Sequence, residues 1–184
     1  MLTMGRLAPQ ERYKGCDEVI ELMPRLLARF PDLKYLIVGE GADQPRLQAK
    51  AAALGLAESV IFTGHIAERE KIAHYNLADV YVMPSTGEGF GIVLIEAAAC
   101  GVPVVGSRVD GSREALLDGR LGRLVDPASE DELHAAISAV LVTGQVGGAD
   151  NARQRFDCVD TFSVENFRSR VADWCRQQAA HAAI

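Results

Sequence analysis

The sequence predicts an α/β fold in which a parallel sheet carries helices on both of its faces. Three observations support this prediction: short apolar runs alternate with longer amphipathic segments, the short runs are apolar throughout, and most of them end at glycine or proline. Strands that are buried on both faces read as continuous apolar runs, whereas a strand with one solvated face alternates apolar and polar residues. The alternation of strand and helix then favours parallel pairing through helical crossovers.

Five apolar runs of strand length follow a short opening strand that ends just before Arg6. The first run stops at Gly39, the second at Gly64 and the third at Pro84, and these residue types favour turns. We assign strands to residues 33–38, 59–63, 78–85, 102–107 and 122–125.

Five further segments have helical spacing or helical end signals. The first is rich in alanine and closes at Gly55, and another closes at Gly101. Ser129, with an acid three residues later, has the pattern of a capping box. We assign helices to residues 44–55, 67–77, 92–100, 112–119 and 129–141.

The chain changes character after residue 142. Residues 142–155 are rich in glycine and polar residues, and we expect a loop or a helix break there. Residues 161–178 then read as an amphipathic helix with Ser163 as its N-cap. We therefore divide the chain into a domain at 1–160 and a C-terminal helix at 161–184. The apolar face of this helix consists of Val164, Phe167, Val171 and Trp174.

Composition places the 184-residue chain among ordinary globular proteins of one domain. Its net charge of −6 and its aromatic content of 6% argue against a nucleic-acid-binding protein. No apolar run reaches the ~20 residues of a membrane helix, and the start lacks the pattern of a signal peptide. The cysteines have no regular spacing, so we expect reduced thiols in a cytoplasmic protein.

The densest chemical signal is PSTGEGFGIVLIEAAACGVPVV, residues 84–105, where three glycines separate an expected strand from an expected helix. Glycines let a ligand approach the backbone and its N–H groups, and the helix adds the positive end of its dipole, which suits a diphosphate. Glu88 lies within the glycine loop and Glu96 about one turn into the helix. Carboxylates are better partners for hydroxyl groups than for phosphates, so a ligand with both phosphates and polyols would use all these parts.

The opening GRLAPQERYKG, residues 5–15, supplies a second signal. Arg6 and Lys14 follow the first expected strand and could neutralise a diphosphate leaving group. Alone, each would more often be a solvated surface cation; beside the glycine loop, the diphosphate role is favoured. Ligands of parallel sheets bind beyond the carboxyl ends of the strands, so we expect both signals at that edge.

Motifs of several other functional classes are missing from the sequence. The segment Gly39–Gly41 lacks the third glycine of a dinucleotide fingerprint, and there is no Walker loop and no G-x-S-x-G nucleophile motif. The histidines share no ligand spacing, and Glu70 with His74 would make only half of a metal site. We therefore expect no metal centre.

Taken in order, the motifs resemble the C-terminal half of the retaining GT-B glycosyltransferases of family GT4, also called group 1 transferases. The resemblance runs from Gly5 to about Leu141 and includes the G-R-L…K-G opening, V-G-x-G, F-T-G-H, A-D-V-Y-V-M-P-S and E-G-F-G-I-V-L-I-E. The last run carries the family's E-x7-E motif as Glu88 and Glu96. The resemblance implies a Rossmann-like sheet that binds a nucleotide-diphosphate sugar such as a UDP- or GDP-hexose.

The resemblance also implies roles for individual residues. Arg6 and Lys14 would hold the diphosphate and stabilise its departure, and Glu88 would contact hydroxyls of the donor sugar; these three are the expected catalytic residues. Glu96 would hold the ribose hydroxyls, and Ile66 would border the base. The remaining expected donor-binding residues are Gly89, Phe90, Gly91 and Ile92. Hexosyl transfer would retain the anomeric configuration and need no metal cofactor.

A complete enzyme of this family also has an N-terminal domain that binds the acceptor, and the last helix of the family fold crosses back to it. We expect this chain to need that partner domain and to be inactive alone. Nothing in this half indicates contact with nucleic acid or membrane, although the partner domain could make the protein membrane-peripheral. Val164 and the stretch G-S-R-E (111–114) depart from the family pattern, which leaves the base and the sugar open. A GT-B nucleotide-sugar epimerase and a non-catalytic nucleotide-sugar-binding module remain as alternatives.

Overall fold

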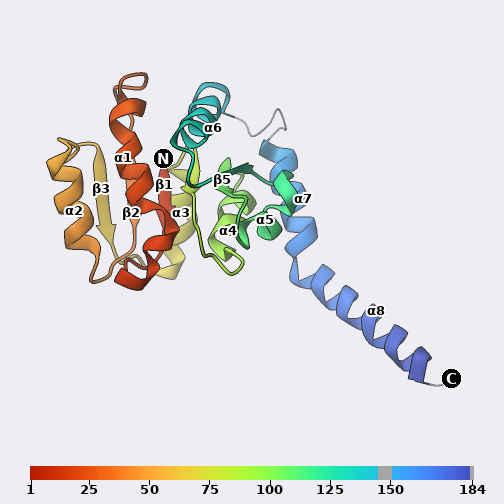
Figure 1. The fold of residues 1–184 in the computed structure, drawn as a ribbon. Helices are drawn as coiled ribbons and strands as arrows, with labels where there is room; N and C mark the ends of the chain where they lie inside the picture. Colours follow the sequence, from red (N-terminus) through yellow and green to blue (C-terminus); the bar gives the residue numbers. More distant parts are fainter. Residues whose placement is uncertain (145–150, 183–184) are drawn as a thin grey trace.

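A six-stranded sheet forms the centre of the structure, a computed structural model that describes residues 1–144 and 151–182 (Figure 1). Its strands lie in the order β3-β2-β1-β4-β5-β6, and all of their pairings are parallel. This confirms the predicted α/β class, and the order is that of a doubly wound sheet whose connections reverse direction between β1 and β4. The strands are β1 (Leu2–Met4), β2 (Tyr35–Val38), β3 (Val60–Gly64), β4 (Tyr81–Met83), β5 (Val104–Ser107) and β6 (Arg123–Val125).

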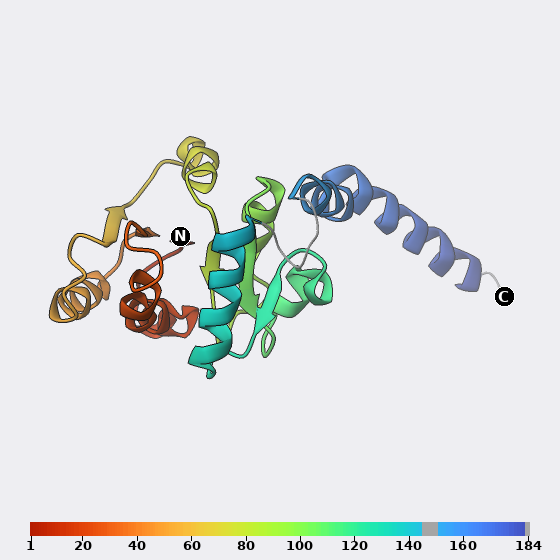
Figure 2. The ribbon, with the colours of Figure 1, turned by 90° about the horizontal axis from the view of Figure 1, so that it is seen from above.

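Helices cover both faces of the sheet (Figures 1 and 2). One core cluster joins α1, α2 and α6 to one face, and the other joins α3, α4, α5 and α7 to the opposite face. Within β4, Val82 belongs to the first cluster and Tyr81 to the second, which explains why this strand is apolar at successive positions. The helices are α1 (Cys16–Leu27), α2 (Gln44–Ala53), α3 (Lys71–Asn76), α4 (Ile92–Ala99), α5 (Ser112–Ala115), α6 (Glu130–Thr143), α7 (Asn151–Phe162) and α8 (Val164–Ala182).

The predicted strands and helices are present, most of them within tighter bounds. Three elements run past their predicted ends: β3 to Gly64, α6 to Thr143 and α8 to Ala182. Two predicted helices are each divided into a 3-10 turn and an α-helix: η2 (Glu68–Glu70) precedes α3, and η3 (Leu117–Gly119) follows α5. Ser129 is the N-cap of α6, because its Oγ accepts a hydrogen bond from the N–H of Glu132 at 3.3 Å. The second half of the predicted capping box is wrong, since the Glu132 carboxylate accepts from the N–H of Asp126 and pairs with Arg108.

Two helices lie where no helix is predicted. The helix α1 covers residues to which we assigned no element, and α7 occupies the end of the expected loop at 142–155, of which residues 145–150 lie outside the described residues. The inward face of α7 is partly polar: Gln154 is 2% exposed and donates to the backbone carbonyls of Val102 and Leu121. A helix that packs through such contacts leaves no apolar stripe for the sequence to reveal.

The last helix, α8, leads away from the sheet toward the C-terminus (Figures 1 and 2). Its predicted N-cap is confirmed, because Oγ of Ser163 accepts from the N–H of Asn166 at 3.2 Å. The four apolar residues predicted to share one face, Val164 to Trp174, are between 44% and 61% exposed. The domain boundary at residue 160 stays a prediction. Within the described ranges, no helix is long and apolar enough to cross a membrane.

Candidate functional site

The carboxyl ends of β1 and β4 lie side by side at the point where the sheet connections reverse, and a hollow of about 420 Å³ opens there. Arg6 follows β1, Lys14 ends the 3-10 helix η1 (Pro9–Lys14), and the glycine loop connects β4 to α4. The structure thus brings together six of the predicted site residues, which are Arg6, Lys14, Glu88, Phe90, Gly91 and Ile92. Gly89 does not line this hollow.

The two cations of the hollow share one carboxylate that the sequence does not single out. Glu11 is only 8% exposed; its Oε1 accepts from Nε of Arg6 at 2.6 Å, and its Oε2 accepts from Nζ of Lys14 at 2.5 Å. The hydrogen bond from Arg6 lowers the pKa of Glu11 below its ordinary value, with Lys14 acting in the same direction and burial opposing both. Glu11 is therefore ionised at neutral pH. Glu11 precedes Lys14 by three residues, and this spacing was the feature of the sequence that could have indicated their pairing.

The glycine loop ends at Gly91, whose φ of 89° lies in the left-handed region and which is the N-cap of α4. In the described part of the chain, the backbone N–H groups of Gly89, Phe90 and Gly91 donate to no other group. They precede the positive end of the α4 dipole, so the loop has the properties predicted for an anion site. The N–H of Glu88 differs, because it donates to Asp110.

Asp110, which follows β5, holds the glycine loop through hydrogen bonds. The sequence alone does not indicate this contact. Oδ2 of Asp110 accepts from Oγ of Ser85 at 2.6 Å and from the N–H of Glu88 at 2.9 Å, while Oδ1 accepts from the N–H of Ser112 at 3.0 Å. The adjacent Gly111 donates its N–H to the carbonyl of Glu88 at 2.9 Å. The Asp-Gly-Ser sequence is typical of such an Asx turn, but its partner loop follows a different strand.

Gly111→Ala is expected to destabilise the domain by about 2 kcal/mol or more, because a Cβ atom there would lie 2.1 Å from the carbonyl oxygen of Gly89. Urea denaturation followed by circular dichroism measures the change. Gly87→Ala, in the glycine loop that Gly111 contacts, is the control, since its Cβ would meet Tyr13 at an ordinary 3.4 Å. Equal losses of unfolding free energy in the two variants would show that the close approach of Gly111 to the Gly89 carbonyl does not contribute to stability.

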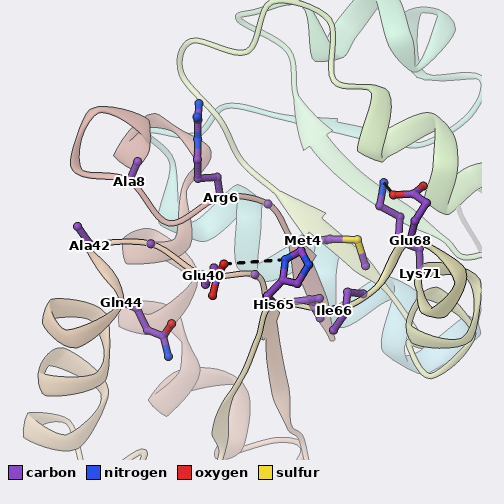
Figure 3. A pocket seen from close by; sticks show the side chains of 14 residues that line it. Met4, Arg6, Ala8, Glu40, Ala42, Gln44, His65, Ile66, Glu68 and Lys71 are labelled. Atoms are coloured by element: carbon purple, nitrogen blue, oxygen red, sulfur yellow. Dashed lines mark ion pairs between the residues drawn. The ribbon is translucent and has the colours of Figure 1, made fainter.

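A second hollow of about 820 Å³ shares Arg6 with the first. Figure 3 shows the side chains that line this second hollow. Ile66, the predicted neighbour of a base, lies here. Glu40 faces His65, with Oε1 4.0 Å from Nδ1, and Lys71 pairs with Glu68 at 3.1 Å on another side (Figure 3). The mixture of an apolar wall and carboxylates suits a flat polar group such as a base.

Glu96 lies in a third hollow of about 390 Å³, which adjoins the second because Glu68 and Lys71 line both. The hydroxyl of the buried Tyr75 donates to Oε2 of Glu96 at 2.7 Å, and Nζ of Lys71 donates to Oε1 at 3.4 Å. Burial, followed by the neighbouring Tyr81 and the hydrogen bond to Glu96, raises the pKa of Tyr75, so its hydroxyl keeps its proton. Buried tyrosines usually bond a partner through the hydroxyl, but the sequence does not say which partner.

Among the residues that the structure describes, no group of three or more His, Cys, Asp or Glu side chains could hold a metal ion. Glu70 and His74 do not pair through their side chains: the Glu70 carboxylate accepts from the N–H of Ala67 at 2.9 Å, and the His74 ring contacts the backbone oxygen of Glu70.

Comparison with known families identifies the fold's relatives. The model of a family described as glycosyl transferases group 1 matches residues 1–156. The chain belongs to this family. It is 37% identical over 180 residues to a GDP-mannose-dependent alpha-(1-6)-phosphatidylinositol monomannoside mannosyltransferase of Mycolicibacterium smegmatis, covering 94% of this chain and 46% of that protein. A phosphatidyl-myo-inositol mannosyltransferase of Mycobacterium tuberculosis is 38% identical over 178 residues, covering 95% and 43%. This group 1 chain thus spans about half the length of the curated relatives it matches.

Solved structures agree with the family assignment. The sucrose-phosphate synthase of Thermosynechococcus elongatus matches this group 1 chain with a TM-score of 0.79 and 28% identity, over 98% of this chain and 46% of that one. The C-terminal domain of the group 1 protein LpcC from Francisella tularensis matches with a TM-score of 0.71 and 26% identity, over 88% and 84%. These matches confirm that the fold is the Rossmann-like C-terminal half of GT-B. Anabaena HepE in complex with UDP and glucose has the same fold, at a TM-score of 0.80 and 24% identity over 95% and 47%.

Proposed function

We propose that this group 1 chain is the nucleotide-sugar-binding half of a retaining hexosyltransferase whose donor is GDP-mannose. The observation that carries the proposal is the hollow between β1 and β4, where Arg6 and Lys14 face a loop with open N–H groups. Two cations, open amides and a helix N-terminus together supply the donor groups that a diphosphate accepts from. The mannosyl donor is taken from the relatives at 37–40% identity, which are named mannosyltransferases.

The proposed mechanism uses the three hollows for three parts of the donor. Arg6, Lys14 and the loop amides hold the diphosphate and stabilise the negative charge that it gains when its bond to the sugar breaks and the sugar passes to the acceptor. Glu88 lies in the same hollow and orients the sugar hydroxyls, while Glu96 accepts from the ribose hydroxyls and Ile66 borders the base. Because these groups neutralise the leaving diphosphate, the proposal requires no metal.

The sugar acceptor is assigned to a partner domain that this chain does not include, so the chain alone is expected to bind donor and transfer nothing. A cytoplasmic location is part of the proposal, because the four cysteines at positions 16, 100, 158 and 175 have no regular spacing that indicates a disulfide framework. The epimerase alternative is not favoured, because the relatives above are named transferases.

Calorimetry with GDP, UDP and ADP tests the proposal on the chain as it stands. We expect GDP to bind most tightly, with a Kd roughly between micromolar and millimolar, because closure by a partner domain is missing. GDP-mannose incubated with the chain and a lipid or sugar acceptor should release no product beyond that of a blank. Failure to bind any of the three nucleotides would reject the proposal, and a preference for UDP would reject only the base.

Glu96→Ala is expected to weaken GDP binding about tenfold and pyrophosphate binding hardly at all, since a charged hydrogen bond to the ribose would be lost. Tyr75→Phe should have a smaller effect in the same direction, because it removes the 2.7 Å hydrogen bond that orients Glu96. Calorimetric titrations with both ligands measure the difference. Equal losses for GDP and pyrophosphate would contradict the ribose assignment.

A further inference from the structure

We propose that Glu11 is a positioning residue that holds the Arg6 guanidinium and the Lys14 ammonium where a diphosphate binds. This inference rests on the proposed function and adds a residue for which the sequence analysis predicts no role. It depends on the geometry of three side chains: one buried carboxylate lies between two cations, and each of its oxygens serves a different cation.

Arg6 is the cation that depends on Glu11. Its side chain is 71% exposed, and in the part of the chain that the structure describes its guanidinium bonds only to Glu11, through Nε and one terminal nitrogen. An exposed arginine without a partner samples many rotamers, and ordering it on binding costs free energy. Glu11 removes this cost in advance, because the carboxylate fixes the plane of the guanidinium.

Lys14 is held by more than one contact. It is 16% exposed, donates from Nζ to the carbonyl of Arg6 at 3.5 Å, and lies against Gly5, where a Cβ atom would come within 3.1 Å of Nζ. Loss of Glu11 should therefore release Arg6 more than Lys14. A guanidinium has several N–H donors, so Arg6 can bind phosphate oxygens while it stays bonded to Glu11.

Glu11→Gln distinguishes two possible roles of the Glu11 carboxylate, because they predict opposite changes in the affinity for an anion. Removing a carboxylate from beside two cations strengthens their attraction for an anion if its charge is all that matters. If Glu11 positions the cations, the variant binds more weakly, because a carboxamide offers one acceptor oxygen and turns an N–H donor toward the other cation.

Pyrophosphate titrations by calorimetry compare the wild-type chain with Glu11→Gln, with thermal melting as a check of folding. We expect Glu11→Gln to weaken pyrophosphate binding about tenfold. Glu58→Gln is the control for net charge, because Glu58 precedes β3 at the amino ends of the strands, away from the hollow. In an Arg6→Ala background, Glu11→Gln should cause a much smaller loss, since its effect passes through Arg6. Binding by Glu11→Gln that equals or exceeds wild type would overturn the proposal.

A spectroscopic measurement on the unmodified chain tests the same contact without relying on any variant. The Nε–H of Arg6 should exchange with solvent at least about tenfold more slowly than that of the exposed Arg69, because it is hydrogen-bonded to a buried carboxylate. Equal exchange rates would overturn the proposal even if the variants failed to fold. If the wild-type chain bound neither pyrophosphate nor GDP, the proposed function would fail and this role with it, whereas an unimpaired Glu11→Gln in a binding-competent chain would reject this role alone.

Discussion

A chain that carries both Arg6→Ala and Lys14→Ala is expected to bind GDP about 100-fold more weakly than the wild-type chain or worse. Each substitution removes a cation that lines the hollow between β1 and β4, and together they leave Glu11 there without its two partners. An unpaired carboxylate would then repel the diphosphate, so the effects on binding should exceed the sum of the single substitutions. Calorimetry with GDP measures the loss.

The matched control removes two positive charges elsewhere, with Arg153→Ala in α7 and Arg168→Ala in α8. Both side chains are exposed, and we expect a change in GDP affinity of at most about twofold, because exposed charges beyond a Debye length are screened. A folded Arg6→Ala/Lys14→Ala chain that lost less than about tenfold would place the diphosphate outside this hollow.

Glu88→Gln is expected to lower kcat about 100-fold, or ~2.7 kcal/mol, once the chain is part of a complete transferase. Glu88 lines the same hollow as the two cations, and its backbone is held at two points: its N–H donates to Asp110 and its carbonyl accepts from the N–H of Gly111. The carboxylate is thus presented at a fixed place, where it can orient sugar hydroxyls and offset positive charge on the ring. The amide keeps the shape and loses the charge.

Steady-state kinetics on the full-length protein measures the effect of Glu88→Gln, and calorimetry on this chain should show nearly unchanged GDP affinity. Glu58→Gln serves as the control for the loss of one carboxylate. A Glu88→Gln enzyme with kcat within a few-fold of wild type would remove Glu88 from the mechanism.

The sheet is predictable from the sequence because its inner strands are buried on both faces, as Tyr81 and Val82 of β4 illustrate by facing different clusters. The meeting of Arg6, Lys14 and Glu88 is predictable for a related reason: parallel strands bring their carboxyl ends to one edge. The helix α7 is harder to predict, since its inward face combines apolar residues such as Cys158 with the buried polar Gln154.

Three residues that support the site cannot be predicted from the sequence, for a different reason. Glu11, Asp110 and the hydroxyl of Tyr75 act through hydrogen bonds to groups that only the tertiary structure brings near. Asp110 follows β5 and the loop that it holds follows β4, so their contact depends on the adjacency of two strands that the sequence does not order. Residue types and spacing therefore indicate the side chains that reach a ligand. They indicate less well the side chains that hold those ligand-binding groups in place.

The first strand of the chain, β1, lies in the middle of the sheet, with β2 and β3 on one side and β4, β5 and β6 on the other. The hollow in which we propose that a diphosphate binds is built from both sides of this arrangement, because Arg6 follows β1 and the glycine loop follows β4. A partly unfolded form that has lost either half of the sheet therefore has no binding site. A ligand that binds only the folded state raises the free energy of unfolding, by ~2.7 kcal/mol at a concentration of 100 times its Kd. If the proposal is correct, the donor stabilises the whole domain against unfolding, including α6, which lines no part of the hollow, and not only the loops that it touches.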